Sequence, residues 1–252
     1  MRYKSVLLLT ACINPNGMTY TKLQDCNIRL SQYKNALNWY LANTLFPIIF
    51  IENSNTYIGD DYQTYINSGR IEFITFDGNN FPKYLGKGYG EALILQKALN
   101  ESVLLRNSDF VIKVTGRLII LNILGLAKES LKKETVSSLA YLNRDGEKIC
   151  SSYFIISPIT FLQDFFLKKK ELINDSKGIY FEHVLYMAIV EWINEGNKFH
   201  SFYRYIDTLG VSGSSGENYN RKTIMNSFKA LIKGIYINIL KKGRYIYGMN
   251  KI

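Results

Sequence analysis

Residues 4–12 have the sequence KSVLLLTAC, a nearly continuous apolar run that is followed at 14–17 by the turn-forming sequence NPNG. A short apolar run bounded by turn residues is typical of a strand that is buried on both faces of a parallel sheet. Three more short strand-like segments follow at residues 47–51, 70–76 and 109–115. We therefore expect four core strands in the first half of the chain.

Segments with apolar residues at helical spacing alternate with these strands, at residues 23–41, 62–68 and 90–100. The alternation predicts an α/β fold, with a mostly parallel, Rossmann-like sheet flanked by helices. Ligands of such sheets bind beyond the carboxyl ends of the strands. The four strand ends are polar and lie at residues 10–16, 52–55, 77–80 and 115–117. We expect them to form one cleft.

The second half of the chain has a different pattern. Residues 136–142 and 148–157 flank the turn sequence NRDG and are typical of a β-hairpin. The Gly- and Ser-rich sequence LGVSGSSGENYN at 209–220 is expected to be a mobile loop. The remaining predicted elements are helices at 161–173 and 181–193 and a strand at 198–205. We predict one domain over 1–220, with a donor half at 1–117 and a smaller acceptor half at 118–220.

The net charge of +10 is concentrated at the C-terminus, because residues 221–252 hold eight basic residues and no acidic one. Apolar residues recur at helical spacing from 224 to 239, so the segment is predicted to be a basic amphipathic helix. Such a helix binds anionic membrane surfaces, which we take as the expected partner. The alternatives are a helix packed on the body with a basic edge, or a nucleic-acid-binding segment. We expect no nucleic-acid partner.

The cysteines Cys12, Cys26 and Cys150 are odd in number and lack CxxC spacing, which argues against a disulfide framework and for a reducing compartment. No apolar run approaches the ~18 residues that a membrane span needs. A signal peptide at 1–17 is the alternative interpretation of the N-terminus, but its apolar core is short and no small-residue cleavage site follows. We expect a cytoplasmic protein, peripheral on the inner face of the cell membrane.

Common catalytic motifs are missing from the sequence. It contains no HExxH, GxSxG or GxxxxGK[ST] motif, and no GxGxxG follows the first strand. With only two histidines, a His-rich metal site is not expected.

Several segments together resemble bacterial glycosyltransferases of capsule and O-antigen assembly, whose donor domain has the GT-A fold. They are LLLTACINPN, IENSN, GKGYGE, SDFVIKVTGR and YFEHVLY. The resemblance implies an inverting, hexosyltransferase-like enzyme that moves a sugar from a nucleotide-sugar to a lipid-linked saccharide. Two alternatives remain open. A sugar-phosphate nucleotidyltransferase would carry a G-x-G-T-R loop after the first strand, and a non-catalytic module would act through the basic C-terminal segment.

The chain departs from the GT-A pattern at the end of the fourth strand, where Asp-x-Asp normally holds a divalent metal. The sequence there is KVTGR, with Lys113 and Thr115 on one face of the strand and Arg117 after it. Because cations can replace a metal at a diphosphate by direct hydrogen bonding, we expect donor binding without a metal. Lys87, in the Gly-rich loop before a helix, is a further candidate phosphate ligand. The alternative for Lys87 is an ordinary exposed loop lysine, and the alternative for Arg117 is an ion pair with a nearby carboxylate.

Other donor contacts follow from the strand ends and from the resemblance. Thr10 and Ala11 are small and suit a close approach by the base or ribose. Glu52 and Asn53 end the second strand. Arg29 faces the nucleotide in one interpretation and forms an exposed ion pair with the residue four positions earlier in the other.

The resemblance also implies the acceptor side. Glu182 is the candidate general base, with Asp77 as the second choice. Glu91 and His183 are candidate acceptor contacts. The alternative for Glu182 and Glu91 is a carboxylate that only stabilises the first turn of its helix.

Overall fold

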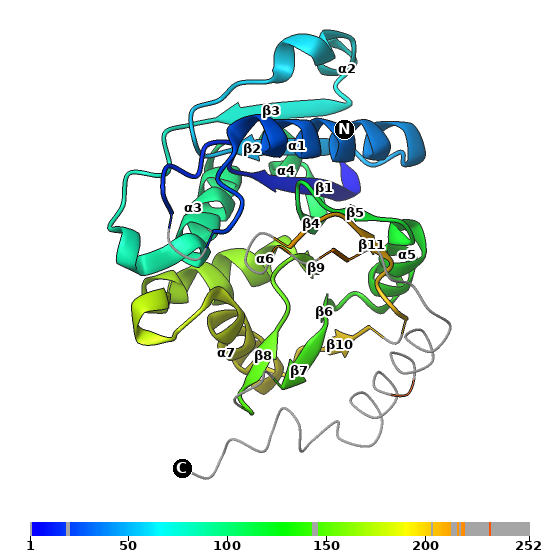
Figure 1. Ribbon diagram of the computed structural model, residues 1–252. Helices are drawn as coiled ribbons and strands as arrows, with labels where there is room; N and C mark the ends of the chain where they lie inside the picture. The colour runs from blue at the N-terminus through cyan, green and yellow to red at the C-terminus, as the bar shows by residue number, and fades with distance from the viewer. Residues whose placement is uncertain are drawn as a thin grey trace.

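The computed structural model describes residues 2–18, 21–142, 146–202 and 204–212, together with residues 216, 218, 219 and 232. Within this part of the chain, seven strands form one sheet in the order β10-β6-β9-β4-β1-β2-β3 (Figure 1). The parallel strands of its first half are β1 (Tyr3–Ala11), β2 (Ile48–Glu52), β3 (Ile71–Thr75) and β4 (Ser108–Thr115). The predicted α/β class is confirmed.

The second half of the chain extends the same sheet. Strand β9 (Phe154–Pro158) runs antiparallel to β4, with Ile112 opposite Ile156, and β6 (Val136–Ser138) pairs antiparallel with β9. The edge strand β10 (Phe199–Ser201) returns parallel to β6. The two halves of the chain therefore share one sheet.

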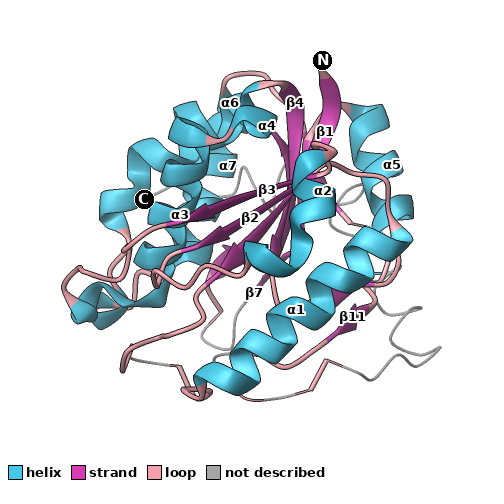
Figure 2. Ribbon diagram, turned by 90° about the horizontal axis from the view of Figure 1, so that it is seen from above, coloured by secondary structure: helices cyan, strands magenta, loops and turns pink. Residues whose placement is uncertain are grey.

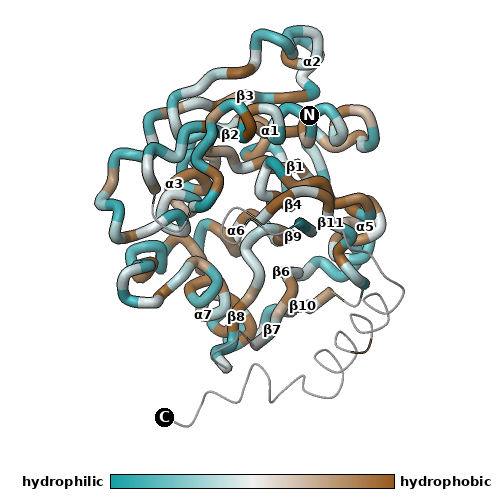
Figure 3. The backbone as a smooth tube through the Cα atoms, viewed as in Figure 1, coloured by the Kyte–Doolittle hydropathy of each residue, from teal (hydrophilic) through white to brown (hydrophobic). Residues whose placement is uncertain are grey.

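Helices cover both faces of the sheet (Figure 2). Because side chains alternate along a strand, Leu7 and Leu9 pack toward α1 (Cys26–Asn43) and α5 (Ile123–Lys133). Leu8 packs on the other face, toward α3 (Gly86–Glu101) and α7 (Phe181–Asn194). In Figure 3, α3 and α5 carry both hydrophobic and hydrophilic segments, as helices with one buried face do.

Short elements complete the described structure. They are η1 (Gly59–Tyr62), α2 (Gln63–Asn67), η2 (Lys83–Leu85), α4 (Val103–Arg106), β5 (Ile119–Ile120), β7 (Ala140–Leu142), β8 (Lys148–Cys150), α6 (Ile159–Phe161), η3 (Leu162–Phe166), η4 (Leu167–Leu172), η5 (Asp175–Lys177) and β11 (Thr208–Leu209). None of the helices among the described residues combines the length and hydrophobicity that a membrane crossing requires.

The predicted hairpin is present along both of its arms. Strands β7 and β8 pair antiparallel near the turn, with Ala140 opposite Cys150, and β6 and β9 pair antiparallel at the base, with Ser137 opposite Ile156. The base of the hairpin also belongs to the main sheet. There Phe154 on β9 is fully buried and stacks on Phe202, with ring centroids 5.2 Å apart.

Two expectations about single elements need correction. The helix expected at 161–173 is a succession of α6, a π-helical turn (η3) and a 3₁₀ turn (η4). Phe165 and its neighbour Phe166 both contact α7, at Trp192 and Phe181, and the wider π turn accommodates both contacts. The strand expected at 198–205 is shortened to β10. Residues 213–215, 217 and 220 of the 209–220 loop, and all of the basic segment 221–252 except residue 232, lie outside the described residues. The mobility and the helix predicted there stay predictions.

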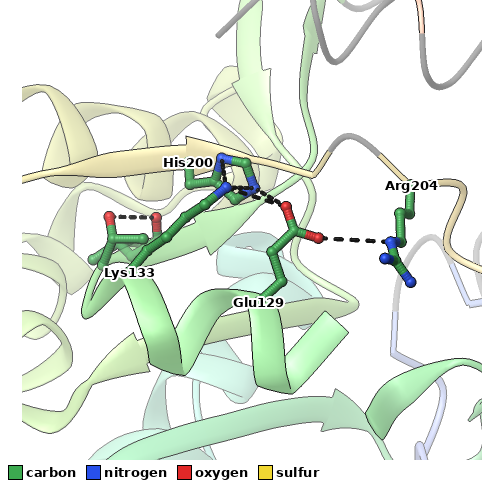
Figure 4. Close-up of polar contacts among 6 residues, drawn as sticks. Glu129, Lys133, His200 and Arg204 are labelled. Carbon is green, nitrogen blue, oxygen red and sulfur yellow. Dashed lines mark hydrogen bonds and ion pairs between the residues drawn. The ribbon is translucent and has the colours of Figure 1, made fainter. Parts of the chain in front are cut away.

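A polar cluster fastens α5 to the strand at the far edge of the sheet (Figure 4). His200 Nε2 lies 2.8 Å from Glu129 Oε1 and 3.0 Å from Lys133 Nζ. The Arg204 guanidinium approaches the other oxygen of Glu129 at 3.9 Å. Burial by itself would raise the pKa of Glu129, but hydrogen bonds from Lys133 and His200 hold it below its usual value. None of these four residues lines the cleft described next, so we assign them to stability.

Candidate active site

A cleft of about 600 Å³ opens beyond the carboxyl ends of the parallel strands and is lined by residues of both halves of the chain. Nine of the thirteen residues singled out from the sequence line it. They are Thr10, Ala11, Arg29, Asn53, Lys87, Glu91, Thr115, Arg117 and Glu182. Cys12, Tyr33, Asn79 and Asp175, among others, join them. The single cleft expected from the strand ends is present.

Asparagine side chains form one end of the cleft. Asn53, 2% exposed, donates from its backbone N–H to the Ala11 carbonyl at 3.1 Å, which joins the ends of β1 and β2. Its Nδ2 donates to Asn79 Oδ1 at 3.2 Å, and Asn79 Nδ2 donates to the Asn14 carbonyl at 3.0 Å. Among the described residues, Asn53 Oδ1 has no hydrogen-bond partner although it is buried. An amide oxygen in this position can accept a hydrogen bond from a nucleobase or ribose.

Arg29 is buried rather than paired on the surface. Its Nε donates to the Cys12 carbonyl at 2.7 Å, and Nη1 donates to the Leu23 carbonyl at 3.3 Å. Asp25, the residue four positions earlier, instead caps α1 by accepting the N–H groups of Asn27 and Ile28 at 2.8 and 2.9 Å. The expectation of an exposed ion pair is therefore wrong. Arg29 holds the loop after β1 and brings a positive charge to the cleft wall.

Arg117 follows the end of β4 and is 9% exposed. Its Nη1 donates to the Val211 carbonyl at 2.8 Å, and burial lowers the pKa of this guanidinium. A Cβ atom at the preceding Gly116 would lie 2.9 Å from the Thr10 carbonyl oxygen, so glycine permits β4 to end against β1. The sequence TGR thus places a buried cation in the cleft.

Lys113 and Glu91 form an ion pair beneath this surface. Lys113 Nζ lies 2.5 Å from Glu91 Oε1 and donates to the Ser152 carbonyl, and the lysine side chain is 1% exposed. Thr10 Oγ1 donates to the same Glu91 oxygen at 3.0 Å. Lys113 is not among the residues that line the cleft, so the expected direct phosphate contact is wrong. It fixes Glu91, which does face the cleft.

A lysine and two carboxylates meet where α3, η5 and α7 converge. Burial lowers the pKa of Lys87, and the nearby charges of Glu182 and Asp175 oppose that shift. Burial raises the pKa of Asp175 to about 6, with Lys87 as the main opposing charge. Glu182 lies in the first turn of α7 and accepts a hydrogen bond from Ser152 Oγ. Asp175 was missed from the sequence because its surroundings, NDSKG, look like an ordinary surface turn.

Glu52 is fully buried, and its carboxylate accepts backbone N–H groups of Ile13 at 2.8 Å and Thr56 at 2.8 Å. It shapes the loops around the cleft without lining it, so the predicted donor contact is replaced by a structural role. Asp77 follows β3, is exposed, and does not line the cleft. The expectation that Asp77 faces the cleft is therefore wrong.

His183 also lies outside the cleft lining. Its Nδ1 accepts the Tyr180 backbone N–H at 3.1 Å, and its Nε2 lies 2.9 Å from Glu147 Oε2. The ring thereby closes the N-terminus of α7. This position corrects the predicted acceptor contact.

Tyrosines from the second half of the chain form one wall of the cleft. Tyr141, Tyr153 and Tyr219 line the cleft, and the rings of Tyr153 and Tyr219 lie 5.6 Å apart. Burial raises the pKa of Tyr141 to about 12, so its hydroxyl stays protonated at neutral pH. Aromatic faces with a hydroxyl at the rim are suited to sugar rings. The sequence holds 19 tyrosines, but no local pattern marked these three for a common wall.

The residues at the end of β4 do not fit the divalent metal of typical GT-A enzymes. Thr115 and Arg117 stand there instead of carboxylates, and an arginine cannot ligate a cation. Across the described residues, no cluster of three or more His, Cys, Asp or Glu side chains is arranged to hold a metal ion.

No protein-family model and no curated protein matches the chain. Among solved structures, the chain is similar to a candidate nucleotide-diphospho-sugar transferase from Desulfovibrio desulfuricans G20, with 12% identity over 79% of this chain and 80% of that chain, at a TM-score of 0.45. It is similar to S. aureus TarS in complex with UDP, with 10% identity over 97% of this chain and 74% of that chain, at a TM-score of 0.46. A cytidylyltransferase from Leptospira borgpetersenii has 13% identity over 100% and 99%, at a TM-score of 0.39. At these values the likenesses say nothing about the substrate of this chain.

Proposed function

We propose that the chain is a GT-A-like glycosyltransferase that transfers a sugar from a nucleotide-sugar without a metal ion. One observation carries the proposal: a single cleft at the carboxyl edge of the sheet contains Arg117 and Lys87 together with the carboxylate of Glu182. Two cations in one cleft suit a diphosphate, and a nearby carboxylate suits a base for an incoming hydroxyl.

The donor would bind across the ends of β1, β2 and β4. The amides of Asn53 and Asn79 and the small residues at the end of β1 suit the nucleoside. Arg117 and Lys87 would then contact the diphosphate and take over the charge that a metal supplies elsewhere. Because Arg117 is buried, its hydrogen bonds to phosphate oxygens gain strength from the low local dielectric.

The transfer itself would be a direct displacement. The acceptor hydroxyl oxygen attacks C1 of the donor sugar and gives its proton to Glu182. The bond from C1 to the phosphate oxygen breaks, its electron pair leaves with the nucleoside diphosphate, and the configuration at C1 inverts. Ser152 Oγ, which donates to the Glu182 carboxylate, would hold the base in position.

We further propose a lipid-linked saccharide of bacterial surface polysaccharide assembly as acceptor. The tyrosine wall supports a saccharide acceptor. The eight cations of residues 221–252 support a position on the anionic inner face of the membrane, where such lipid carriers are met.

A calorimetric titration with UDP, GDP, dTDP, CDP and CMP, each in EDTA and in Mn²⁺, tests the donor part. We expect one nucleotide to bind equally well in both. Arg117→Ala should weaken that binding about tenfold or more, as expected for a charge-assisted contact of about 1.5–3 kcal/mol. Arg204→Ala, at a side chain that is 67% exposed and outside the cleft, is the matched control. Binding of none of these nucleotides, or binding only with Mn²⁺, contradicts the proposal.

A further inference from the structure

Asp175 has a hydrogen-bonding capacity that the protein leaves unused. The residue is 5% exposed and lines the cleft. Among the residues that the structure describes, its Oδ1 atom is buried and has no hydrogen-bond partner. A buried carboxylate oxygen without a donor is costly, by about 1–3 kcal/mol or more. Such an atom at a cleft wall points to a donor that arrives with a ligand.

The other carboxylate oxygen explains how Asp175 is held. The Lys87 backbone N–H, at the start of α3, hydrogen-bonds the carboxylate, which thereby caps that helix. The Oδ2 atom fills the space beside Gly86, where an added Cβ atom would lie 1.9 Å away. Capping uses one oxygen, so it leaves the orphaned Oδ1 unexplained.

The turn that carries Asp175 is closed by its own hydrogen bonds. Asn174 N–H donates to the Ile179 carbonyl at 2.8 Å, and the Ile179 N–H returns to the Asn174 carbonyl at 3.1 Å. The Gly178 N–H donates to the Asp175 carbonyl at 3.2 Å. A closed turn presents the side chain at a fixed place, as a binding group requires.

The charges around Asp175 limit what the missing donor can be. Lys87 on α3 and Glu182 on α7 are the charged groups that face it. A phosphate or a carboxylate would be repelled, because it brings acceptors and negative charge. Lys87 already supplies the positive charge that an ammonium group would add. A neutral donor group remains, and the hydroxyls of a sugar are such groups.

We propose that Asp175 Oδ1 binds a hydroxyl group of the donor sugar and so helps to select that sugar. The inference rests on the proposed function, because it assumes a nucleotide-sugar in the cleft. The donor sugar is favoured over the acceptor because Asp175 is fixed to the start of α3, next to Lys87, where the diphosphate would lie. Glu182 acts as the base and Asp175 as the specificity-determining group.

The test compares nucleotide-sugars with their nucleoside diphosphates by calorimetry at pH 7.5. The probes are UDP with UDP-glucose, UDP-galactose and UDP-N-acetylglucosamine, GDP with GDP-mannose, and dTDP with dTDP-rhamnose. In Asp175→Ala, we expect the affinity for the bound nucleotide-sugar to fall about 10–100-fold, while that for the nucleoside diphosphate changes less than threefold. Asp175→Asn, which keeps an oxygen for the α3 cap, should give a smaller loss of the same kind. Asp61→Ala, at a side chain that is 64% exposed, is the control.

A donor analogue that lacks one hydroxyl sharpens the test. For the hydroxyl that Asp175 binds, the deoxy analogue should bind wild-type protein as weakly as the full donor binds Asp175→Ala. Removing the hydroxyl and substituting Asp175 together should lower the affinity no more than either change alone. Equal losses for nucleotide-sugar and nucleoside diphosphate, or no loss for either, overturn the inference while leaving the proposed function intact. Failure of wild-type protein to bind any nucleotide overturns the proposed function, and this inference with it.

Discussion

The carboxylate of Asp175 occupies the place where a side chain at Gly86 would begin. A Cβ atom on Gly86 would lie 1.9 Å from Asp175 Oδ2, and the backbone of Gly86 has a φ of +83°. Both features exclude other residues at this position. The glycine at the start of the GKGYG sequence therefore leaves room for the Asp175 carboxylate, which comes from the other half of the chain.

Gly86→Ala should destabilise the protein strongly. A positive φ costs an alanine about 1–2 kcal/mol, and the clash with Asp175 should add about 1–3 kcal/mol. The matched control is Gly178→Ala, at a φ of +73° with no atom within 4 Å of the added Cβ, which should lose only the first contribution. Urea unfolding of both variants measures the difference. Equal losses would show that the Asp175 contact is unimportant.

Asp175→Asn should stabilise the protein at neutral pH. Because burial raises the Asp175 pKa to about 6 from a usual 3.8, the native state binds more protons than the unfolded state between these values. Wild-type stability therefore falls as the pH rises from about 4 to 6, and the asparagine variant escapes this loss. We expect the variant to be about 1–3 kcal/mol more stable at pH 7.5 and equal near pH 3.5. A difference that does not change with pH would contradict this account.

Lys113→Met should be among the most destabilising changes that keep the size of a side chain. It leaves the Glu91 carboxylate, 2.5 Å from the lysine in the native protein, without its partner, which costs about 3–5 kcal/mol for buried pairs. The double variant Lys113→Met with Glu91→Gln should lose less, because no unpaired charge remains. Lys97→Met, whose partner Glu101 lies one helical turn away with a half-exposed side chain, should change stability by less than about 1 kcal/mol. Chemical unfolding of the three variants measures their free energies of unfolding. Similar losses of stability for Lys113→Met and Lys97→Met would contradict this prediction.

Glu182→Gln should preserve nucleotide-sugar binding and lower the transfer rate by roughly 10²–10⁴-fold, as loss of a general base does. The measurement is turnover at saturating donor, beside calorimetric donor affinity. Glu195→Gln, exposed at the opposite end of α7, should keep full activity. Near-normal turnover in Glu182→Gln would place the base elsewhere.

The basic segment 221–252 should bind vesicles that contain anionic lipid. Its eight cations and its apolar stripe should act together, so salt should weaken the association without abolishing it. A chain that ends at Asn220 should lose sedimentation with vesicles and keep nucleotide binding and its melting temperature. If the shortened chain sediments equally, or no longer folds, the segment belongs to the packed domain.

Several site residues show where prediction from local sequence stops. Glu52 ends strand β2 and Asp77 comes shortly after β3, and both carry a carboxylate. Glu52 is enclosed by the loops after β1 and β2, whose N–H groups it accepts, while Asp77 is exposed to solvent. The paths of the loops decide which of the two carboxylates is buried, and those paths depend on contacts between distant residues. Lys113 lies on β4 as predicted, but its side chain pairs with Glu91 on α3 and does not reach the cleft.

The sequence by itself determined the four parallel strands and the common edge where they end, because apolar runs and turn residues are local signals that need no partner. It also placed Arg117 at that edge, directly after a strand, whereas Lys87 was predicted from its Gly-rich loop and Glu182 from the resemblance to glycosyltransferases. Only the tertiary structure decided that Asp175 joins them and that Oδ1 is left without a donor. Its turn has no local feature that distinguishes it from a surface turn. Burial and missing partners are properties of surroundings that residues from α3 and α7 create together.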